Sequence, residues 1–222
     1  MIAMILAAGR GERLRPITDR LPKPLVEVDG VSLLERHLKS LADAGVTTVV
    51  INLGWLGEMI VECIGSGCRY GLQVCYSPEY DQILDTGGGI RRALPLLGRD
   101  PFWVVNSDIL TDFALPRADL EDDCSAHLVL VATPADKAHG DFDLIDGRIR
   151  NGEKPAYTYS GIACYRPEFF AQQPADRFSV VPLLRQAADC GKLSGSLYEG
   201  QWADVGTVAK LTDINRDLSG RA

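Results

Sequence analysis

The first two-thirds of the chain alternates apolar runs with segments whose apolar residues recur at helical spacing. The runs that predict buried strands occupy residues 2–7, 46–51, 72–76, 101–105 and 127–132. The helical patterns that lie between them cover residues 33–44, 55–64 and 90–97. Because strands that alternate with helices pair in parallel through right-handed crossovers, the pattern predicts an α/β fold with a mostly parallel sheet flanked by helices.

The first of these helices has recognisable signals at both ends. Ser32 and Glu35 have the spacing of a capping box, in which the serine side chain accepts a bond from the glutamate backbone. An apolar stripe that includes Leu34 and Leu41 follows, and Gly45 is typical of a helix C-terminus. We therefore expect the second strand to begin directly after this glycine.

The pattern changes after residue 139. Gly147 stands in a hairpin-like turn, and residues 157–165 are rich in strand formers. We expect an antiparallel lobe over residues 140–165 that extends the same sheet. Two further helical patterns, at residues 179–190 and 207–218, predict helices that close the fold.

The domain organisation follows from the continuity of these patterns. Neither a linker-like stretch nor an internal repeat divides the chain. We expect a single domain over residues 1–222, with a ligand-binding core at 1–135 and the smaller lobe with its closing helices at 136–222.

The composition is that of a soluble globular protein. The 222 residues are 46% hydrophobic and 24% charged, which matches ordinary globular domains. The apolar runs are far shorter than the roughly 20 residues that span a bilayer. The first run has no basic residue before it, so it is a poor signal peptide. We expect no membrane partner.

The charge is unevenly distributed along the chain. The net charge of −7 disfavours a nucleic-acid partner. Residues 10–23 nevertheless hold five basic side chains and two acidic ones, whereas the remainder holds 18 basic and 28 acidic. This basic segment is suited to a small polyanion, or it is a solvated charged loop, and charge by itself leaves both interpretations open.

Cysteine and histidine spacing narrows the possible chemistry. None of the six cysteines forms a C-x-x-C pair, and the three histidines are scattered. The pattern is typical of free thiols in a reducing compartment, so we expect a cytoplasmic protein. Zinc-ligand spacing and a nucleophile elbow are both missing from the sequence. A metal site would therefore be built from oxygen ligands.

The segment after the first strand suggests phosphate binding. Gly9 and Gly11 allow backbone amides to approach phosphate oxygens closely. The dinucleotide-binding fingerprint needs a further glycine where this chain has Leu14, and the Walker A spacing is missing too, so both motifs are excluded. Pro16 prevents an immediate helix, so the segment continues as a loop.

Within this loop, Lys23 stands between Pro22 and Pro24. The prolines restrict the backbone on both sides, and a preplaced ammonium suits a phosphate. Ligands of parallel sheets bind at the carboxyl ends of the strands. We therefore expect this loop to meet residues 106–108, which end a later strand.

Four segments, in order, resemble the signatures of the sugar-1-phosphate nucleotidylyltransferases, and the resemblance covers essentially the whole chain. The segments are Ala7-Ala8-Gly9-x-Gly11-x-Arg13-x-x-Pro16-x-Thr18 with Pro22-Lys23-Pro24-Leu25, Thr86-Gly87-Gly88-Gly89, Asn106-Ser107-Asp108, and Trp202-Ala203-Asp204-Val205-Gly206-Thr207. The resemblance implies a Rossmann-like, glycosyltransferase-A-like nucleotidyltransferase fold, in which the core binds a nucleoside triphosphate and the antiparallel lobe binds a sugar 1-phosphate.

The resemblance also implies the reaction and the roles of individual residues. A nucleotidyl group passes to the sugar 1-phosphate, pyrophosphate leaves, and Mg²⁺ is the cofactor. The implied catalytic residues are Arg13, Lys23 and Asp108, and the implied metal ligands are Asp108 and Asp204. The implied nucleotide-binding residues are Leu6, Ala8, Gly9, Gly11, Arg13, Lys23, Gly87 and Gly88. The implied sugar-binding residues are Asn106, Gly140 and Glu153.

Within the family, the chain is most similar to short uridylyltransferases of cell-wall recycling. This likeness rests on the order of the segments, on residues 140–142 and on residues 160–162. It implies UTP and N-acetylmuramate 1-phosphate as substrates of a monomer or weak homo-oligomer. The alternatives are a guanylyltransferase for mannose or heptose 1-phosphate and a non-catalytic sensor of nucleotide-sugars. Leu14, Pro16 and the segment Pro22-Lys23-Pro24 disfavour an oxidoreductase that binds a dinucleotide.

Overall fold

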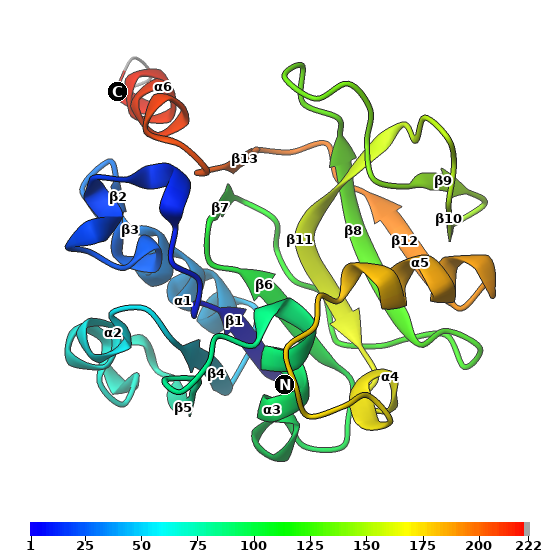
Figure 1. Cartoon of the computed structure of the whole chain (residues 1–222), viewed down its shortest axis with the longest axis horizontal. Coiled ribbons are helices and arrows are strands. Elements are labelled where there is room, and N and C mark those ends of the chain that lie inside the picture. Colours follow the sequence, from blue (N-terminus) through cyan, green and yellow to red (C-terminus); the bar gives the residue numbers. More distant parts are fainter. Residues whose placement is uncertain (220–222) are drawn as a thin grey trace.

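A nine-stranded mixed sheet forms the centre of the structure, a computed structural model that describes residues 1–219 (Figure 1). The strand order is β5-β4-β1-β6-β11-β8-β12-β10-β9. The bounds are β1 (Ile2–Leu6), β4 (Thr48–Leu53), β5 (Gln73–Pro78), β6 (Phe102–Asn106), β8 (Ala126–Ala132), β9 (Asp143–Ile145), β10 (Arg148–Arg150), β11 (Tyr157–Tyr165) and β12 (Leu193–Leu197). Strands β5, β4, β1 and β6 are parallel, as the sequence predicts.

Helices pack on both faces of this sheet. Apolar residues of α1 (Leu33–Asp43) and α2 (Gly57–Ile64) share one core cluster with β1, β4 and β6. A second cluster on the other face joins α3 (Asp85–Leu97), α4 (Glu168–Ala171) and α5 (Val181–Asp189) to the sheet. The result is a three-layer α/β arrangement, and the predicted fold class is confirmed.

Two small antiparallel sheets and the last helix complete the structure. Strand β2 (Glu27–Val28) pairs with β3 (Val31–Ser32), and β7 (Ile109–Thr111) pairs with β13 (Trp202–Asp204), both antiparallel. Helix α6 (Val208–Ser219) packs through Leu211 on a third cluster that contains Leu14 and Val28. This packing brings the C-terminal segment next to the loop that follows β1.

The capping signals of the first helix are present in the structure. Ser32 Oγ accepts a bond from the Glu35 backbone at 3.2 Å, and Gly45 lies just beyond the helix with a φ of 78°. The second strand, however, begins at Thr48 and not at Val46. The backbone amides of Val46 and Thr47 bond to Leu41 O and Met1 O, so these residues form the turn that feeds the strand.

The predicted antiparallel lobe is present and extends the same sheet. Strands β9 and β10 form a hairpin whose turn has left-handed backbone at Asp146 and Gly147, the pairing typical of a tight two-residue turn. Strand β11 runs antiparallel between β6 and β8 and has a bulge between Tyr159 and Ile162. The lobe is thereby joined directly to the parallel half.

Helix α3 and strand β12 are among the elements that differ from the sequence-based prediction. Helix α3 begins at Asp85, five residues before the expected start at Ile90, and therefore contains three glycines. Glycines carry no apolar periodicity, so the pattern does not reveal the first turn. Strand β12 was not predicted, because its Ser-Gly-Ser centre is poor in strand formers. It pairs in parallel with β8, which supplies the order that its own sequence lacks.

Two further features can be compared with the sequence analysis: the state of the cysteines and the length and apolarity of the helices. All six cysteines are free; Cys124 and Cys164 are buried, whereas Cys68 and Cys190 are exposed. Over residues 1–219, no helix is both long enough and apolar enough to pass through a lipid bilayer.

Candidate active site

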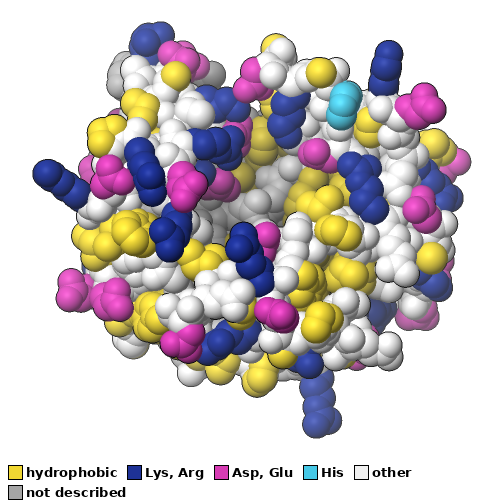
Figure 2. Space-filling view, viewed as in Figure 1, with side chains coloured by type: hydrophobic (Ala, Val, Ile, Leu, Met, Phe, Trp, Pro, Cys, Tyr) yellow, Lys and Arg dark blue, Asp and Glu magenta, His cyan; other side chains and the backbone are white. Residues whose placement is uncertain are grey.

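A cavity of about 860 Å³ opens at the carboxyl ends of β1, β4 and β6. Figure 2 shows the hollow in this face, with Lys and Arg side chains along the rim formed by the segment after β1. Eight of the predicted site residues line it: Leu6, Ala8, Gly9, Gly11, Arg13, Lys23, Asn106 and Asp108. The expected meeting of the glycine loop with residues 106–108 is therefore observed.

The glycine loop is held by bonds to its own later part and to α2's leading turn. Gly11 has a φ of 63°, and a Cβ there would lie 2.9 Å from Thr18 Cγ2, so glycine is required on both counts. Thr18 Oγ1 donates to Gly11 O at 2.8 Å, and Trp55 Nε1 donates to Thr18 O at 2.8 Å. The loop is thus fixed without a ligand.

Lys23 is placed as the two flanking prolines suggest. It begins a 3₁₀ turn, Lys23–Leu25, and its Nζ bonds to Asp108 Oδ2 at 2.6 Å. The Lys23 side chain is 11% exposed and that of Asp108 is 29% exposed. The ammonium is therefore nearly enclosed and lies against the cavity wall, while the carboxylate keeps a face open to the cavity.

Asp204 lies beside Asp108, although 96 positions separate them in the sequence. In the β7–β13 pair, Asp204 is opposite Ile109, and the Val205 amide donates to Asp108 O at 2.7 Å. Gly206 lines the cavity, and a Cβ there would lie 2.8 Å from Asp204 Oδ2. The backbones that carry the two aspartates are therefore neighbours: Asp108 lines the cavity, and Asp204, which does not, lies beside Gly206, which does. Carboxylate oxygens are ligands that a magnesium ion prefers.

A lysine that the sequence analysis did not identify contacts Asp204. Lys210 Nζ, from α6, bonds to Asp204 Oδ1 at 2.5 Å and to Asp136 Oδ2 at 3.0 Å. Burial lowers the pKa of Lys210, but the bonds to both carboxylates outweigh burial and the net shift is upward. The Lys210 side chain also lowers the pKa of Asp136. No motif marks this contact, since Asp136 is brought there only by tertiary folding.

A buried polar network beneath the loop was also missed. The Ala7 amide donates to Asn52 Oδ1 at 2.6 Å, and Asn52 Nδ2 donates to Glu79 Oε1 at 2.8 Å. The Leu84 amide donates to Glu79 Oε2, so that the network reaches the start of α3. Burial raises the pKa of Glu79, and the bonds from Leu84 and Asn52 partly offset this effect. Asn52 ends a parallel strand, and that position is the signal by which it could have been found.

Five predicted residues do not line the cavity in the described part of the chain: Gly87, Gly88, Gly140, Glu153 and Asp204. Gly87 and Gly88 both donate from their amides to Phe178 O, and a Cβ on Gly87 would lie 2.2 Å from the Phe178 ring. These glycines allow α3 to approach the segment before α5 closely. Asp85 and Thr86, which directly precede these glycines, line the cavity.

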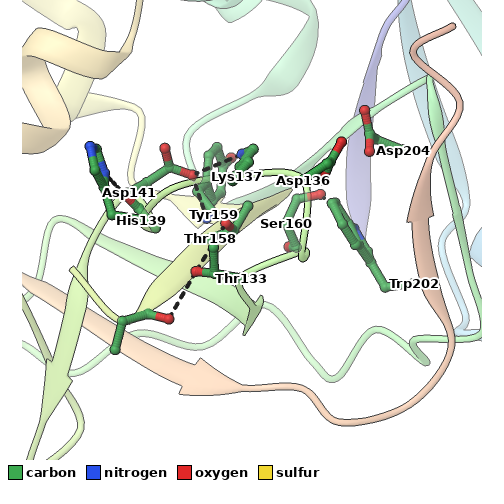
Figure 3. Close-up of polar contacts among 12 residues, drawn as sticks. Thr133, Asp136, Lys137, His139, Asp141, Thr158, Tyr159, Ser160, Trp202 and Asp204 are labelled. Atoms are coloured by element: carbon green, nitrogen blue, oxygen red, sulfur yellow. Dashed lines mark hydrogen bonds and ion pairs between the residues drawn. The ribbon is translucent and has the colours of Figure 1, made fainter. Parts of the chain in front are cut away.

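On the lobe side, polar residues of β11, β13 and the segment between β8 and β9 face one another (Figure 3). Gly140 donates to Pro155 O at 2.7 Å, and Asp141 Oδ2 accepts from the Tyr159 amide at 2.9 Å. Trp202 Nε1 donates to Ser160 O at 2.9 Å. Glu153 is exposed at the surface. These bonds tie the lobe segments to one another, and within the described residues none from 133 to 160 lines the cavity.

A buried histidine, His37, lies near Asp108 and the start of β7. Burial lowers the pKa of His37 to about 4, although the charge of Asp108 and a bond with the Ile109 backbone act in the opposite direction. The ring is therefore neutral at physiological pH. His37 comes from α1, so it links this helix to the carboxylate-bearing segment.

A second acidic group lies away from the cavity. Ligand atoms of Glu121, Asp123 and Cys124 lie within 4.8 Å of one another. Arg148 donates to all three side chains, which satisfies the cluster without a cation. Within residues 1–219, none of the three lines the cavity.

A parallel sheet that carries a glycine loop, a braced lysine and paired carboxylates at its ligand edge defines a phosphate-transfer site. A family model described as Nucleotidyl transferase matches residues 2–220, and the chain belongs to that family. It is 46% identical, over 96% of each chain, to N-acetylmuramate alpha-1-phosphate uridylyltransferase of Neisseria meningitidis serogroup B. It is 36% identical to the protein of the same name from Caulobacter vibrioides, over 92% of this chain and 91% of the relative.

A solved structure agrees with the fold. A crystal structure of a Bacillus anthracis protein in complex with sucrose superimposes with a TM-score of 0.86 at 21% identity, covering 97% of this chain and 94% of that one. The family model and the two relatives confirm the predicted family, and the superposition supports the fold.

Proposed function

We propose that the chain transfers the uridylyl group of UTP to N-acetylmuramate 1-phosphate and releases pyrophosphate. The observation that carries the reaction type is the convergence of the glycine loop, Lys23 and Asp108 on one cavity, with Asp204 on the strand paired next to Asp108. The choice of substrates is supported by the two relatives that bear this activity in their names.

The chemistry requires positioning more than acid–base catalysis. An oxygen of the sugar phosphate attacks the α-phosphorus of UTP, and the bond from that phosphorus to the bridging oxygen of pyrophosphate breaks. The attacking phosphate has a second pKa of about 6 and is already an anion at neutral pH. No general base is needed, so the task of the site is to align the groups and neutralise charge.

The loop residues supply that neutralisation. We assign Arg13 and the backbone amides from Gly9 to Gly11 to the β- and γ-phosphates, where they stabilise the leaving pyrophosphate. Lys23 bridges the attacking phosphate and the α-phosphate, because its ammonium already faces the cavity wall at Asp108. Asp108 and Asp204 would hold Mg²⁺, which when bound supplies further neutralisation of charge at the α-phosphate.

The uracil side is assigned to the backbone near Leu6 and Ala8, which line the cavity at the end of β1. The part of Gly87 and Gly88 in nucleotide binding is indirect: their packing against Phe178 sets the position of Thr86 and Asp85 at the cavity.

The acceptor side is assigned to Asn106, which lines the cavity. The family resemblance also implies Gly140 and Glu153, neither of which lines the cavity, so their contact with the acceptor would need the lobe to move. Asn106 borders the β11 bulge, since a Cβ on Gly161 would lie 2.7 Å from Asn106 Nδ2. Residues 1–135 then bind the nucleotide and residues 136–222 hold the sugar within one domain. One continuous sheet contains strands of both parts, which supports placing them in a single domain. We also propose that the protein acts in the cytoplasm, as a monomer or weak homo-oligomer, without nucleic-acid or membrane partners.

A side-by-side screen tests the substrate pair directly. The four common nucleoside triphosphates are each combined with N-acetylmuramate, N-acetylglucosamine, glucose, mannose and heptose 1-phosphates, and released pyrophosphate is measured. We expect the highest kcat/KM for UTP with N-acetylmuramate 1-phosphate. A preference for GTP with mannose or heptose 1-phosphate would replace the proposed function with a guanylyltransferase.

A further inference from the structure

Lys210 lies between two carboxylates that belong to different segments of the chain. Its ammonium is 2.5 Å from Asp204 Oδ1, at the end of β13, and 3.0 Å from Asp136 Oδ2, in the segment between β8 and β9. Figure 3 shows these two carboxylates side by side above the lobe. Lys210 itself comes from α6. One side chain therefore joins the C-terminal helix, a proposed cation ligand and the acceptor-side segment.

The same arrangement recurs at the other proposed cation ligand, where Lys23 bonds to Asp108. Each carboxylate thus carries one ammonium group. An ammonium and a divalent cation compete for the same carboxylate oxygens, because both interact with them mainly through charge. A cation that binds Asp204 through Oδ1, or through both oxygens, takes the place of Lys210, whose ammonium occupies Oδ1.

Lys210 differs from Lys23 in having a second carboxylate partner. When it leaves Asp204, its bond to Asp136 can remain, so the ammonium is not left without a counter-charge. Asp136 belongs to the segment of residues 133–141, whose far end is fixed to the lobe by Gly140 and Asp141. A lysine that pulls only on Asp136 would hold this segment against α6.

We propose that Lys210 is a positioning residue that gives up Asp204 to the divalent cation and then holds the 133–141 segment over the acceptor through Asp136. This inference rests on the proposed function, because it uses Asp204 as a cation ligand. Lys210 bonds to Asp136 without a cation as well, so the effect of cation loading is that its ammonium is no longer shared with Asp204. The sugar phosphate is then expected to bind best after the cation is in place.

Binding of Mn²⁺ to the full-length protein without substrates tests the exchange. Free Mn²⁺ is measured by electron paramagnetic resonance. Removing the competing ammonium in Lys210→Met should tighten Mn²⁺ binding about threefold to fivefold, the range of a partly exposed ion pair. Asp136→Asn should weaken it, because Lys210 is then left with Asp204 as its remaining partner.

Kinetics test the second half of the proposal. Both variants should raise KM for the sugar 1-phosphate about fivefold, the scale of one such ion pair, while KM for UTP changes less than about twofold. Lys210→Arg should restore the wild-type KM, since it keeps both ion pairs. Lys137→Met removes a positive charge from the same segment without touching Asp204, and should leave Mn²⁺ binding unchanged. Thermal unfolding of each variant shows that it is folded.

Two results would overturn the inference. One is a Lys210→Met variant that is folded but binds Mn²⁺ with unchanged or lower affinity; the other is an unchanged KM for the acceptor in both variants. Asp204→Asn separates this failure from that of the proposed function. If Asp204→Asn binds Mn²⁺ like the wild type, the cation assignment itself is wrong. If it binds less while Lys210→Met is unchanged, the exchange alone is wrong.

Discussion

Lys23 shows how a single residue is prepared for its task by its neighbours. Pro22 and Pro24 restrict the backbone, and Asp108 fixes the ammonium before any ligand arrives. The sequence predicted that the backbone of Lys23 is restricted, because a proline stands on each side of it in the chain. It predicted the carboxylate partner only through the expectation that strand ends meet at one edge. The rotamer of Lys23 and the 2.6 Å distance needed the structure.

The first prediction concerns this lysine. Lys23→Ala should lower kcat at least about 100-fold, the usual effect of losing one preorganised donor at a site of developing charge. The fold should persist, because the Asp108 carboxylate that loses its partner is 29% exposed and can be hydrated. Steady-state kinetics with UTP, together with thermal unfolding, check both parts. A folded variant with near-normal turnover would remove Lys23 from the reaction.

His37 gives a pH-dependent contribution to stability. Its pKa is about 4 in the folded protein against 6.5 for an unperturbed histidine, so the unfolded chain takes up a proton first as pH falls. The stabilisation is complete above pH 6.5 and is lost as pH falls toward 4, and the shift corresponds to about 3 kcal/mol.

Urea unfolding at pH 7 and at pH 5 measures this contribution. The wild type should lose more free energy of unfolding over that interval than His37→Phe, which has no proton to bind. Equal losses in the two proteins would show that His37 is not buried in its neutral form.

At the scale of elements, apolar periodicity predicted the parallel strands and α1, because each of these places an apolar face on the core. The lobe hairpin was predicted from the turn residue Gly147. It failed for the first turn of α3, where three glycines pack against neighbouring chain, and for β12, which is ordered by its partner strand. Contacts such as Lys210 with Asp136 join residues far apart in the sequence, and no local pattern encodes them.

The glycine run of α3 gives the third prediction. A Cβ on Gly89 would lie 2.6 Å from Glu79 Oε1 and 2.9 Å from Asn52 Nδ2. Gly89→Ala gains about 1 kcal/mol of helix propensity. It should nevertheless destabilise the protein by about 1–2 kcal/mol net, because the buried bonds of Glu79 are disturbed. Denaturant unfolding checks this, with Leu96→Ala, at an exposed site in the same helix, as the control. A more stable Gly89→Ala would contradict the tight packing.

At the scale of the whole molecule, segments that are far apart in the sequence come together at the site. The loop after β1, the strand end before β7 and the C-terminal β13 come from three parts of the sequence and meet at the cavity. The packing of α6 on Leu14 and Val28 holds the C-terminal part in place. Because Asp204 follows Asp108 by 96 positions in the sequence, the two aspartates become neighbours only when the chain between them is folded.

Dependence on a divalent cation follows from that pair. Exhaustive treatment with EDTA should abolish pyrophosphate release, and added Mg²⁺ should restore it, because Asp108 and Asp204 leave two carboxylates facing the substrate phosphates. The control is the unfolding temperature, which EDTA should not change. Product formation that continues undiminished after chelation would remove the cation from the proposed function.

The most direct test of the account is a crystal structure of the protein with Mg²⁺ and a non-hydrolysable UTP analogue. We expect the triphosphate in the cavity at the ends of β1 and β6, with Arg13 and Lys23 on its phosphates and one ion bound by both Asp108 and Asp204. A triphosphate bound in another cavity, or an ion held by neither aspartate, would contradict the account.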